Sequence, residues 1–330
     1  MKKFELTSEF ITNIFGIKLF RIKALVEFGN VKVGELGGFV EKEDNLSQSG
    51  DAWVSGDARV YGDARVYGDA VVCGDAWVSG DARVYGDARV FGDARVFGDA
   101  VVCGDARVFG NAEVSGNAEV SGDARVSGDA RVYGDAEVSG NAEVSGDARV
   151  SGDAEVYGDA RVSGNAEVSG NAEVSGDARV SGNAEVYGDA EVCGYARVFG
   201  DARVYGDARV CGDAEVFGNA RVCGDAVVSG NAEVFGNARV CGDAVVCGDA
   251  RVSGDADYSM VKGFGSVYRN TTFFRCKDGS IKVACGCFSG TITEFREKVI
   301  SSYGDKKLAK EYLMIADLMD MHFNKEDKPN

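Results

Sequence analysis

The chain has 330 residues and a formal net charge of −17, and it contains ten cysteines and one histidine. The acidic balance argues against nucleic acid as a direct ligand, because such a ligand needs a basic protein surface. No stretch of 18 apolar residues is present to span a membrane, and the start of the chain lacks the apolar run of a signal peptide. Ten cysteines without a secretory signal favour free thiols in a reducing compartment, so we expect a cytoplasmic protein.

Residues 1–49 are not repetitive and are expected to form a small β-rich N-terminal cap. Apolar and polar side chains alternate over residues 18–25, which predicts a strand, and residues 28–30 have the composition of a turn. Residues 36–40 lead toward a repeat region. Because a repeat structure must cover the core exposed at its end, capping is the expected role of this segment.

Residues 50–256 are built on one hexapeptide. A glycine recurs every six residues from Gly50 to Gly254, 35 times without a miss. Each glycine is followed by Asp or Asn, with the one exception of Tyr195, then by Ala, a variable residue x, Val (except in the incomplete last unit) and a second variable residue y. In a strand, Ala and Val share one face, and x and y share the other. Each hexapeptide therefore predicts one short strand and one bend, and many must stack to close a core.

The hexapeptide, as in the Gly-Asp-Ala-Arg-Val-Tyr of residues 62–67, resembles the hexapeptide-repeat family. Members of that family form left-handed parallel β-helices in which three hexapeptides make one triangular coil of 18 residues. The resemblance covers about two-thirds of the chain. It implies an all-β solenoid of about 11 coils over the 34 valines from Val54 to Val252.

The cap also carries a resemblance. Residues 28–34, 37–40 and 45–47 are similar to the leader of uncharacterised hexapeptide-repeat proteins from bacteria and their phages, which are often labelled putative transferases. Such a label rests on the fold and carries little weight for activity.

The residue content of the repeat bears on catalysis. Acyltransferases that resemble this repeat use a histidine near a loop that interrupts the coils, whereas the only histidine here, His322, lies outside an uninterrupted repeat. We therefore expect no catalytic residue and no cofactor in the repeat. Three functions stay open: a non-enzymatic scaffold or spacer that displays its terminal modules, an acidic decoy of a nucleic-acid-binding protein, and an acyltransferase whose site lies outside the repeat. The first is preferred, with a protein partner or self-association as a homodimer or homotrimer.

Separating the outward positions by 18 residues distinguishes three faces. One column of x positions holds five successive glutamates, and one column of y positions holds three phenylalanines near the C-terminal module. The glutamates are Glu119, Glu137, Glu155, Glu173 and Glu191, and the phenylalanines are Phe199, Phe217 and Phe235. The glutamates can recruit cations or a basic partner, or can simply be solvated after duplication of an 18-residue unit. The phenylalanines predict a docking or self-association strip on an outer surface, or drift in a tolerant column.

The last segment, residues 257–330, is expected to form a ββαα module. Residues 271–276 and 281–287 are β-rich and flank a Lys-Asp-Gly-Ser turn. Residues 291–294 have the pattern of a capping box, and a second helix is expected from about 305 to 323. Its apolar stripe, expected to be core, is Leu308, Tyr312, Ile315, Met319 and Phe323. The segment resembles C-terminal modules of other phage-type repeat proteins.

The same module contains the residue types of a Cys₃His zinc site. They are Cys276, Cys285, Cys287 and His322. Ordinary strand thiols and a histidine at the end of a helix are the preferred interpretation, and no metal is expected.

Overall fold

The computed structural model describes residues 2–265 and 268–324 and divides into two compact units. Unit 1 (residues 1–177) contains the N-terminal cap and the first part of the repeat. Unit 2 (residues 178–330) contains the rest of the repeat and the C-terminal module. The repeat is a parallel β-solenoid of about 12 turns with about 18 residues each, close to the about 11 predicted. The left-handed sense of the coil stays a prediction.

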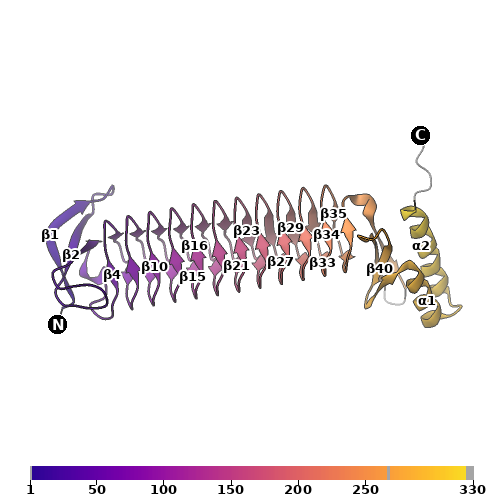
Figure 1. Cartoon of the computed structure of the whole chain (residues 1–330), viewed down its shortest axis with the longest axis horizontal. Helices are drawn as coiled ribbons and strands as arrows, with labels where there is room; N and C mark the ends of the chain where they lie inside the picture. Colours follow the sequence, from indigo (N-terminus) through magenta and orange to yellow (C-terminus); the bar gives the residue numbers. More distant parts are fainter. Residues whose placement is uncertain (1, 266–267, 325–330) are drawn as a thin grey trace. The chain divides into compact units, whose positions relative to one another are not determined.

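The repeat strands β4 to β37 follow the hexapeptide. Each strand consists of the x and Val residues of one hexapeptide, from β4 (Trp53–Val54) to β37 (Arg251–Val252). Four strands are longer: β23 (Glu167–Gly170), β26 (Glu185–Gly188), β29 (Arg203–Gly206) and β32 (Arg221–Cys223). Every third strand pairs in parallel with a shift of 18 residues, so each coil contributes one strand to each of three sheets (Figure 1).

The three sheets of the solenoid are called the first, second and third. In unit 1 the first sheet has the order β3-β5-β8-β11-β14-β17-β20-β23, the second β4-β7-β10-β13-β16-β19-β22, and the third β6-β9-β12-β15-β18-β21-β24. In unit 2 the first sheet has the order β26-β29-β32-β35, the second β25-β28-β31-β34-β37, and the third β27-β30-β33-β36.

The interior of the coils is filled by the two constant apolar residues of the hexapeptide. From Ala52 to Val252, every constant Ala and Val is at most 1% exposed. The x and y residues are half-buried or exposed, as outward positions predict, apart from the buried Trp53, Cys103, Ser115, Ser151, Ser175 and Cys223. Burying a valine contributes roughly 1.5–3 kcal/mol, so the valine columns supply the main stabilising term. This core leaves no room inside the coils for a substrate.

Two physical conditions require glycine at the corners of the coils. The corner glycines from Gly50 to Gly248 have φ between 64° and 78°, a region that other residues enter only with strain. The corners also stack closely: a Cβ on Gly140 would lie 2.9 Å from the backbone nitrogen of Gly158. Both conditions hold at nearly every coil, which explains why the glycine column has no exception.

The Asp/Asn position next to the glycine links neighbouring coils. At a turn, an Asp or Asn side chain typically bonds its own local backbone. In the structure the amides of Asn111, Asn117 and Asn141 each donate to the aspartate 18 residues later, over 2.8–2.9 Å. These side chains therefore join neighbouring coils at the corners.

The N-terminal cap is an antiparallel sheet that continues the first sheet. Strand β1 (Phe4–Thr12) pairs with β2 (Lys18–Ala24), which pairs with β3 (Leu36–Val40). Strand β3 then pairs in parallel with β5 (Arg59–Val60), the first-sheet strand of the first coil, and a 3₁₀ turn, η1 (Glu43–Asn45), follows it. The strand and turn predicted for this region are confirmed, whereas β1 was missed because its alternation is weak.

A lysine is buried between the cap and the first coil. Lys3 is 3% exposed, and its ammonium donates to the carbonyl oxygens of Ala52 at 2.8 Å and Gly50 at 3.2 Å. Burial lowers the pKa of Lys3 from 10.5 to about 8, and the nearby carboxylate of Asp51 opposes this shift. The folded state therefore releases this proton at a lower pH than the unfolded chain.

This shift predicts a pH dependence of stability. Between pH 8 and 10.5 the unfolded chain binds more protons at Lys3 than the folded chain, so unit 1 should gain stability as the pH rises through this window. We expect Lys3→Met to flatten the rise in denaturant midpoint between pH 7.5 and 10, whereas Lys32→Met, at an exposed site, leaves it unchanged. Equal slopes for wild type and Lys3→Met would contradict the buried-lysine assignment.

The C-terminal module is an antiparallel sheet covered by two helices. Its strands, in order, are β38 (Tyr258–Phe264), β39 (Arg269–Arg275), β40 (Ile281–Cys285) and β41 (Phe288–Thr291). They are preceded by a 3₁₀ turn, η2 (Asp255–Asp257), and followed by α1 (Ile292–Tyr303) and α2 (Lys307–Phe323). The ββαα prediction was thus wrong in the number of strands. Strands β38 and β41 were not predicted because apolar and polar residues do not alternate regularly along them.

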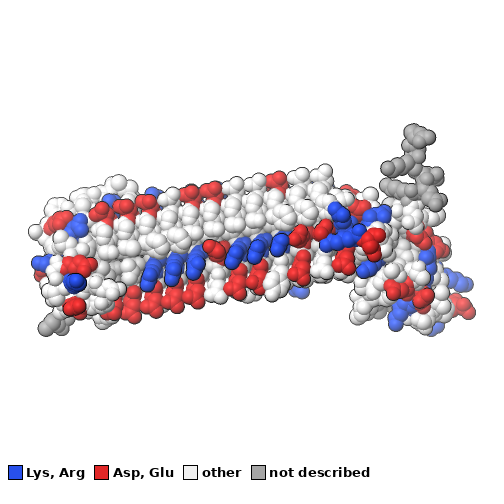
Figure 2. Space-filling view, viewed as in Figure 1, with Lys and Arg blue, Asp and Glu red and all other residues white. Residues whose placement is uncertain are grey.

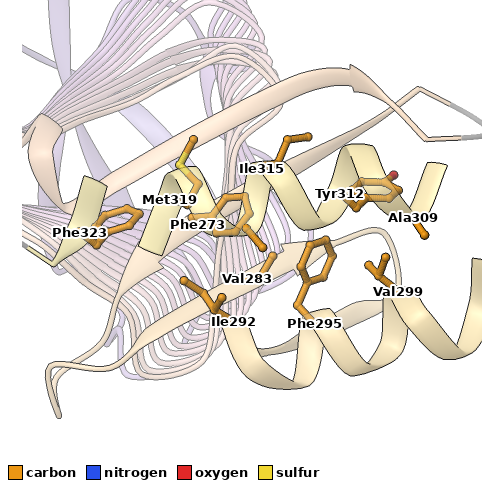
Figure 3. Close-up of a cluster of buried hydrophobic side chains, with 11 residues drawn as sticks. Phe273, Val283, Ile292, Phe295, Val299, Ala309, Tyr312, Ile315, Met319 and Phe323 are labelled. Carbon is orange, nitrogen blue, oxygen red and sulfur yellow. The ribbon is translucent and has the colours of Figure 1, made fainter. Parts of the chain in front are cut away.

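The two helices begin and pack as the sequence predicts. The Thr291 hydroxyl accepts from the Glu294 amide at 3.2 Å, and the Glu294 carboxylate accepts from the Thr291 amide at 2.7 Å. Figure 3 shows α1 and α2 converging on side chains of the sheet. The buried residues of the predicted α2 stripe are Tyr312, Ile315, Met319 and Phe323, with Leu308 half-buried.

The module is joined to the last coils within unit 2. Ala250 forms an isolated antiparallel bridge with Cys276, and the Lys277 amide donates to the Asp249 carbonyl at 3.0 Å. The Val245 amide donates to the Thr272 hydroxyl at 3.0 Å. These bonds satisfy backbone hydrogen-bonding groups at the end of the solenoid, where no further coil follows.

Candidate interaction surfaces

The phenylalanine column lies where sequence analysis placed it, on the second sheet of unit 2. The ring centroids of Phe199 and Phe217 are 4.9 Å apart, those of Phe217 and Phe235 are 5.0 Å apart, and each pair of rings is nearly parallel. The Arg251 guanidinium lies 5.3 Å from the Phe235 centroid. The rings were expected to be exposed, but all three are half-buried, because each ring covers one side of the next. The column therefore offers ring edges more than open faces.

The glutamate column lies on the third sheet. In unit 1, Glu119, Glu137, Glu155 and Glu173 are in register from coil to coil. The two central residues are exposed, whereas the outer two are half-buried beside side chains of the y column. The Tyr157 hydroxyl donates to the Glu173 carboxylate, and this bond raises the pKa of the tyrosine. In unit 2, Glu191 forms an ion pair with Arg209 at 3.2 Å.

The four side chains that a Cys₃His zinc site would need are not brought together. Among residues 2–265 and 268–324, no group of three or more His, Cys, Asp or Glu side chains could hold a metal ion. Cys276 is buried, and burial raises its pKa, while Cys285 accepts from the Thr271 hydroxyl at 3.2 Å. Cys287 and His322 are exposed, and the imidazole packs edge-on against Phe323. The four side chains thus follow the sheet and helix packing instead of a common centre.

Two y-position cysteines form a disulfide. Cys223 and Cys241 occupy neighbouring coils of the first sheet in unit 2, with Cα atoms 4.6 Å apart and a bond between their sulfurs. The expectation of free thiols was therefore wrong for this pair, because the 18-residue spacing stacks the two side chains directly. The other eight cysteines, all within the described residues, are free.

The apolar side chains with the largest exposed fractions lie in the two terminal modules. At the β1–β2 turn of unit 1, Ile14 is 82% exposed and Phe15 is 70% exposed. Together with Tyr61, Trp77 and neighbouring residues they line an open cavity of about 370 Å³ beside the first sheet. This surface was not predicted, because two apolar residues in a turn give no periodic signal.

A second exposed apolar surface lies on α2 in unit 2. Met314, Leu318 and Met321 are 71%, 55% and 71% exposed, on the side of the helix opposite the buried stripe. Their spacing of four and three residues places them on one face. A helix that is apolar on two opposite faces is typical of one that contacts a second surface. The spacing was available in the sequence, but the stronger core stripe masked it.

A third surface consists of arginines. Figure 2 shows basic side chains in short rows along the coils, bordered by acidic ones. On the second sheet of unit 1, Arg89, Arg107 and Arg125 are in register on successive coils. The same 18-residue separation that revealed the glutamates would have found this column.

These features define the chain as a parallel β-solenoid repeat protein with two terminal modules. Five segments match a family model described as the YdcK beta solenoid repeat. They are residues 58–74, 88–104, 118–134, 124–140 and 196–212. The matches cover less than half of the chain and lie in the repeat. They support a repeat β-helix family and give no information about activity.

No curated protein matches the chain. Among the described residues, no helix is long and apolar enough to cross a membrane.

Proposed function

We propose that this protein is a non-enzymatic scaffold or spacer whose solenoid displays two terminal modules that bind protein partners. The observation that carries the proposal is the distribution of exposed apolar side chains. Among the described residues, those of the solenoid coils are Tyr133 and Tyr195 alone, although the coils form most of the chain. The rest lie in the cap and the C-terminal module. They are Phe10, Ile14, Phe15, Leu25, Val33 and Leu36 in the cap, and Phe264, Tyr268, Ile300, Met314, Leu318 and Met321 in the module.

This distribution fits a division of labour. The coils have a closed apolar core and a polar outside, which suits a stiff and soluble element. The terminal modules carry apolar surface that water solvates poorly, which suits contacts with other proteins. The decoy interpretation is less well supported, because a nucleic-acid mimic needs a continuous acidic surface and the second sheet of unit 1 carries arginines.

The proposal predicts that partner binding depends on the modules. The bait is the full chain, with captured proteins identified by mass spectrometry. We expect Met314→Ser, Leu318→Ser and Met321→Ser combined to reduce capture of specific partners at least tenfold, without changing the melting temperature, because these side chains are mostly exposed and lie outside the buried core. A matched triple variant at outward serines of the coils, Ser121→Ala, Ser139→Ala and Ser145→Ala, should leave capture intact. Equal capture by both variants would contradict a role for the α2 surface.

The phenylalanine column is the second predicted contact. Replacing Phe199, Phe217 and Phe235 with Ser should lower partner recovery or oligomer mass in light scattering. Because the rings are half-buried against one another, the effect should be smaller than that of the α2 variant. Unchanged partner recovery and oligomer mass would show that the phenylalanines arose by neutral sequence drift.

A third prediction separates the scaffold from the acyltransferase alternative. The purified chain should show no saturable turnover of acetyl-coenzyme A, since the repeat contains no histidine to act as a general base and the only histidine of the chain is exposed on α2. Turnover that is lost in His322→Ala would contradict the scaffold proposal and place a site in the C-terminal module.

A further inference from the structure

The arginine column of unit 1 is an exposed, positively charged surface. Arg89, Arg107 and Arg125 occupy the x positions of β10 (Arg89–Val90), β13 (Arg107–Val108) and β16 (Arg125–Val126), and all three are exposed. None of them forms an ion pair within the described residues of unit 1. Like charges directly opposite each other on neighbouring strands are destabilising. The column therefore favours a surface that brings negative charge at the same spacing.

The glutamate column of the same unit has that spacing. Its four members follow one another coil by coil on the third sheet, as the arginines do on the second. In both columns neighbouring strands are about 4.8 Å apart, because backbone hydrogen bonds set the distance. The two columns thus have opposite charge and equal pitch, and they lie on different faces of one unit.

We propose that a second copy of this chain is the partner of both columns, and that the arginine column of one copy packs against the glutamate column of another. The inference rests on the proposed function, because it names one partner of the scaffold. A second solenoid matches the pitch over several coils without any adjustment. An unrelated partner would have to reproduce a repeat of charge of about 4.8 Å along its surface.

The direction of the strands selects the arrangement. When two solenoids lie side by side, their facing strands run in the same direction only if the two axes are antiparallel, because the chain circulates around each axis in one sense. An x column then faces an x column, and the order of coils is reversed. One alignment pairs Arg89 with Glu155, Arg107 with Glu137, and Arg125 with Glu119. Glu143, the next residue of the arginine column, then faces Val101, so no carboxylates oppose each other over these four coils.

The neighbouring y columns add apolar contact in this alignment. Phe91 and Phe109 flank the arginines, with parallel rings whose centroids are 4.9 Å apart, and both are half-buried. The reversed order places Phe91 opposite Tyr157 and Phe109 opposite Ser139. A ring thus meets a ring at one coil and a small side chain at the next. Exposed ion pairs alone contribute little to affinity, so the rings are a necessary part of the contact.

The experiment uses the full chain and charge reversal. The acidic variant combines Arg89→Glu, Arg107→Glu and Arg125→Glu, and the basic variant combines Glu119→Arg, Glu137→Arg and Glu155→Arg. Sedimentation velocity in 50 mM NaCl should show self-association of the wild type, at least tenfold weaker in 500 mM NaCl because salt screens exposed charges. Each variant alone should lose this association at least tenfold, and a mixture of the two should recover it, because an acidic second sheet then faces a basic third sheet.

The control reverses three arginines of the first sheet, Arg131→Glu, Arg149→Glu and Arg239→Glu. It lowers the net charge by the same amount as the acidic variant. It should associate like the wild type. A monomeric wild type, equal loss in the control, or no recovery in the mixture would each overturn the inference. Circular dichroism separates these outcomes from misfolding, and the x columns already accept both Arg and Glu. The proposed function stands or fails separately, on partner capture by the α2 variant, which leaves both columns unchanged.

Discussion

Val156→Asp is expected to unfold the central coils of unit 1. Val156 is fully buried and in register with Val138 and Val174 on the third sheet. An aspartate at this position would place a carboxylate among valines and alanines, with no cation or hydrogen-bond donor in reach. We expect a loss of about 3–5 kcal/mol of unfolding free energy, the cost of an uncompensated buried charge. Denaturant unfolding followed by circular dichroism measures this loss.

The neighbouring residue provides the matched control. Tyr157 is half-buried in the outward y column, and the same column has Ser139 and Ser175 on the adjacent coils. Tyr157→Ser removes the hydrogen bond to Glu173, so we expect a loss of about 1 kcal/mol or less. Similar losses for the two variants would show that the inward and outward positions are assigned wrongly.

Gly140→Ala is expected to have the second-largest effect, although it adds one methyl group. Gly140 has φ of 66°, where a residue with a Cβ is strained. The added Cβ would also lie 2.9 Å from the backbone nitrogen of Gly158, and backbone cannot rotate away as a side chain can. The coils must separate locally and lengthen their hydrogen bonds. We expect a loss of about 3 kcal/mol, measured by the shift of the denaturant midpoint.

Gly248→Ala isolates the contribution of stacking. Gly248 has a similar φ of 64°, but no atom lies within 4 Å of the place that an added Cβ would take. Only the backbone strain remains there, and we expect a loss of about 1 kcal/mol. If Gly140→Ala and Gly248→Ala cost the same, conformational strain alone would explain the glycine column.

Some of the surfaces were predictable and others were not. The glutamate and phenylalanine columns follow from the 18-residue spacing, and the structure places both columns as expected. The exposure of the rings was not predictable, since it depends on how closely Phe199, Phe217 and Phe235 stack. The Cys223–Cys241 bond was not predicted for a similar reason, because the 18-residue spacing permits the contact and only the side-chain positions decide whether the bond forms.

The sequence by itself determined the repeat. The unbroken glycine column, the alternation of Ala and Val with outward residues, and the capping box at Thr291 are local signals, so the coils and the start of α1 could be predicted without tertiary contacts. Only the tertiary structure decided which coil corners reject a side chain, that Asn and Asp bond across coils, that β1, β38 and β41 complete the terminal sheets, and that α2 keeps an apolar face uncovered. Each of these depends on residues far apart in the chain, because hydrogen bonding and packing between neighbouring coils or strands, and not local conformational preference, decide the outcome.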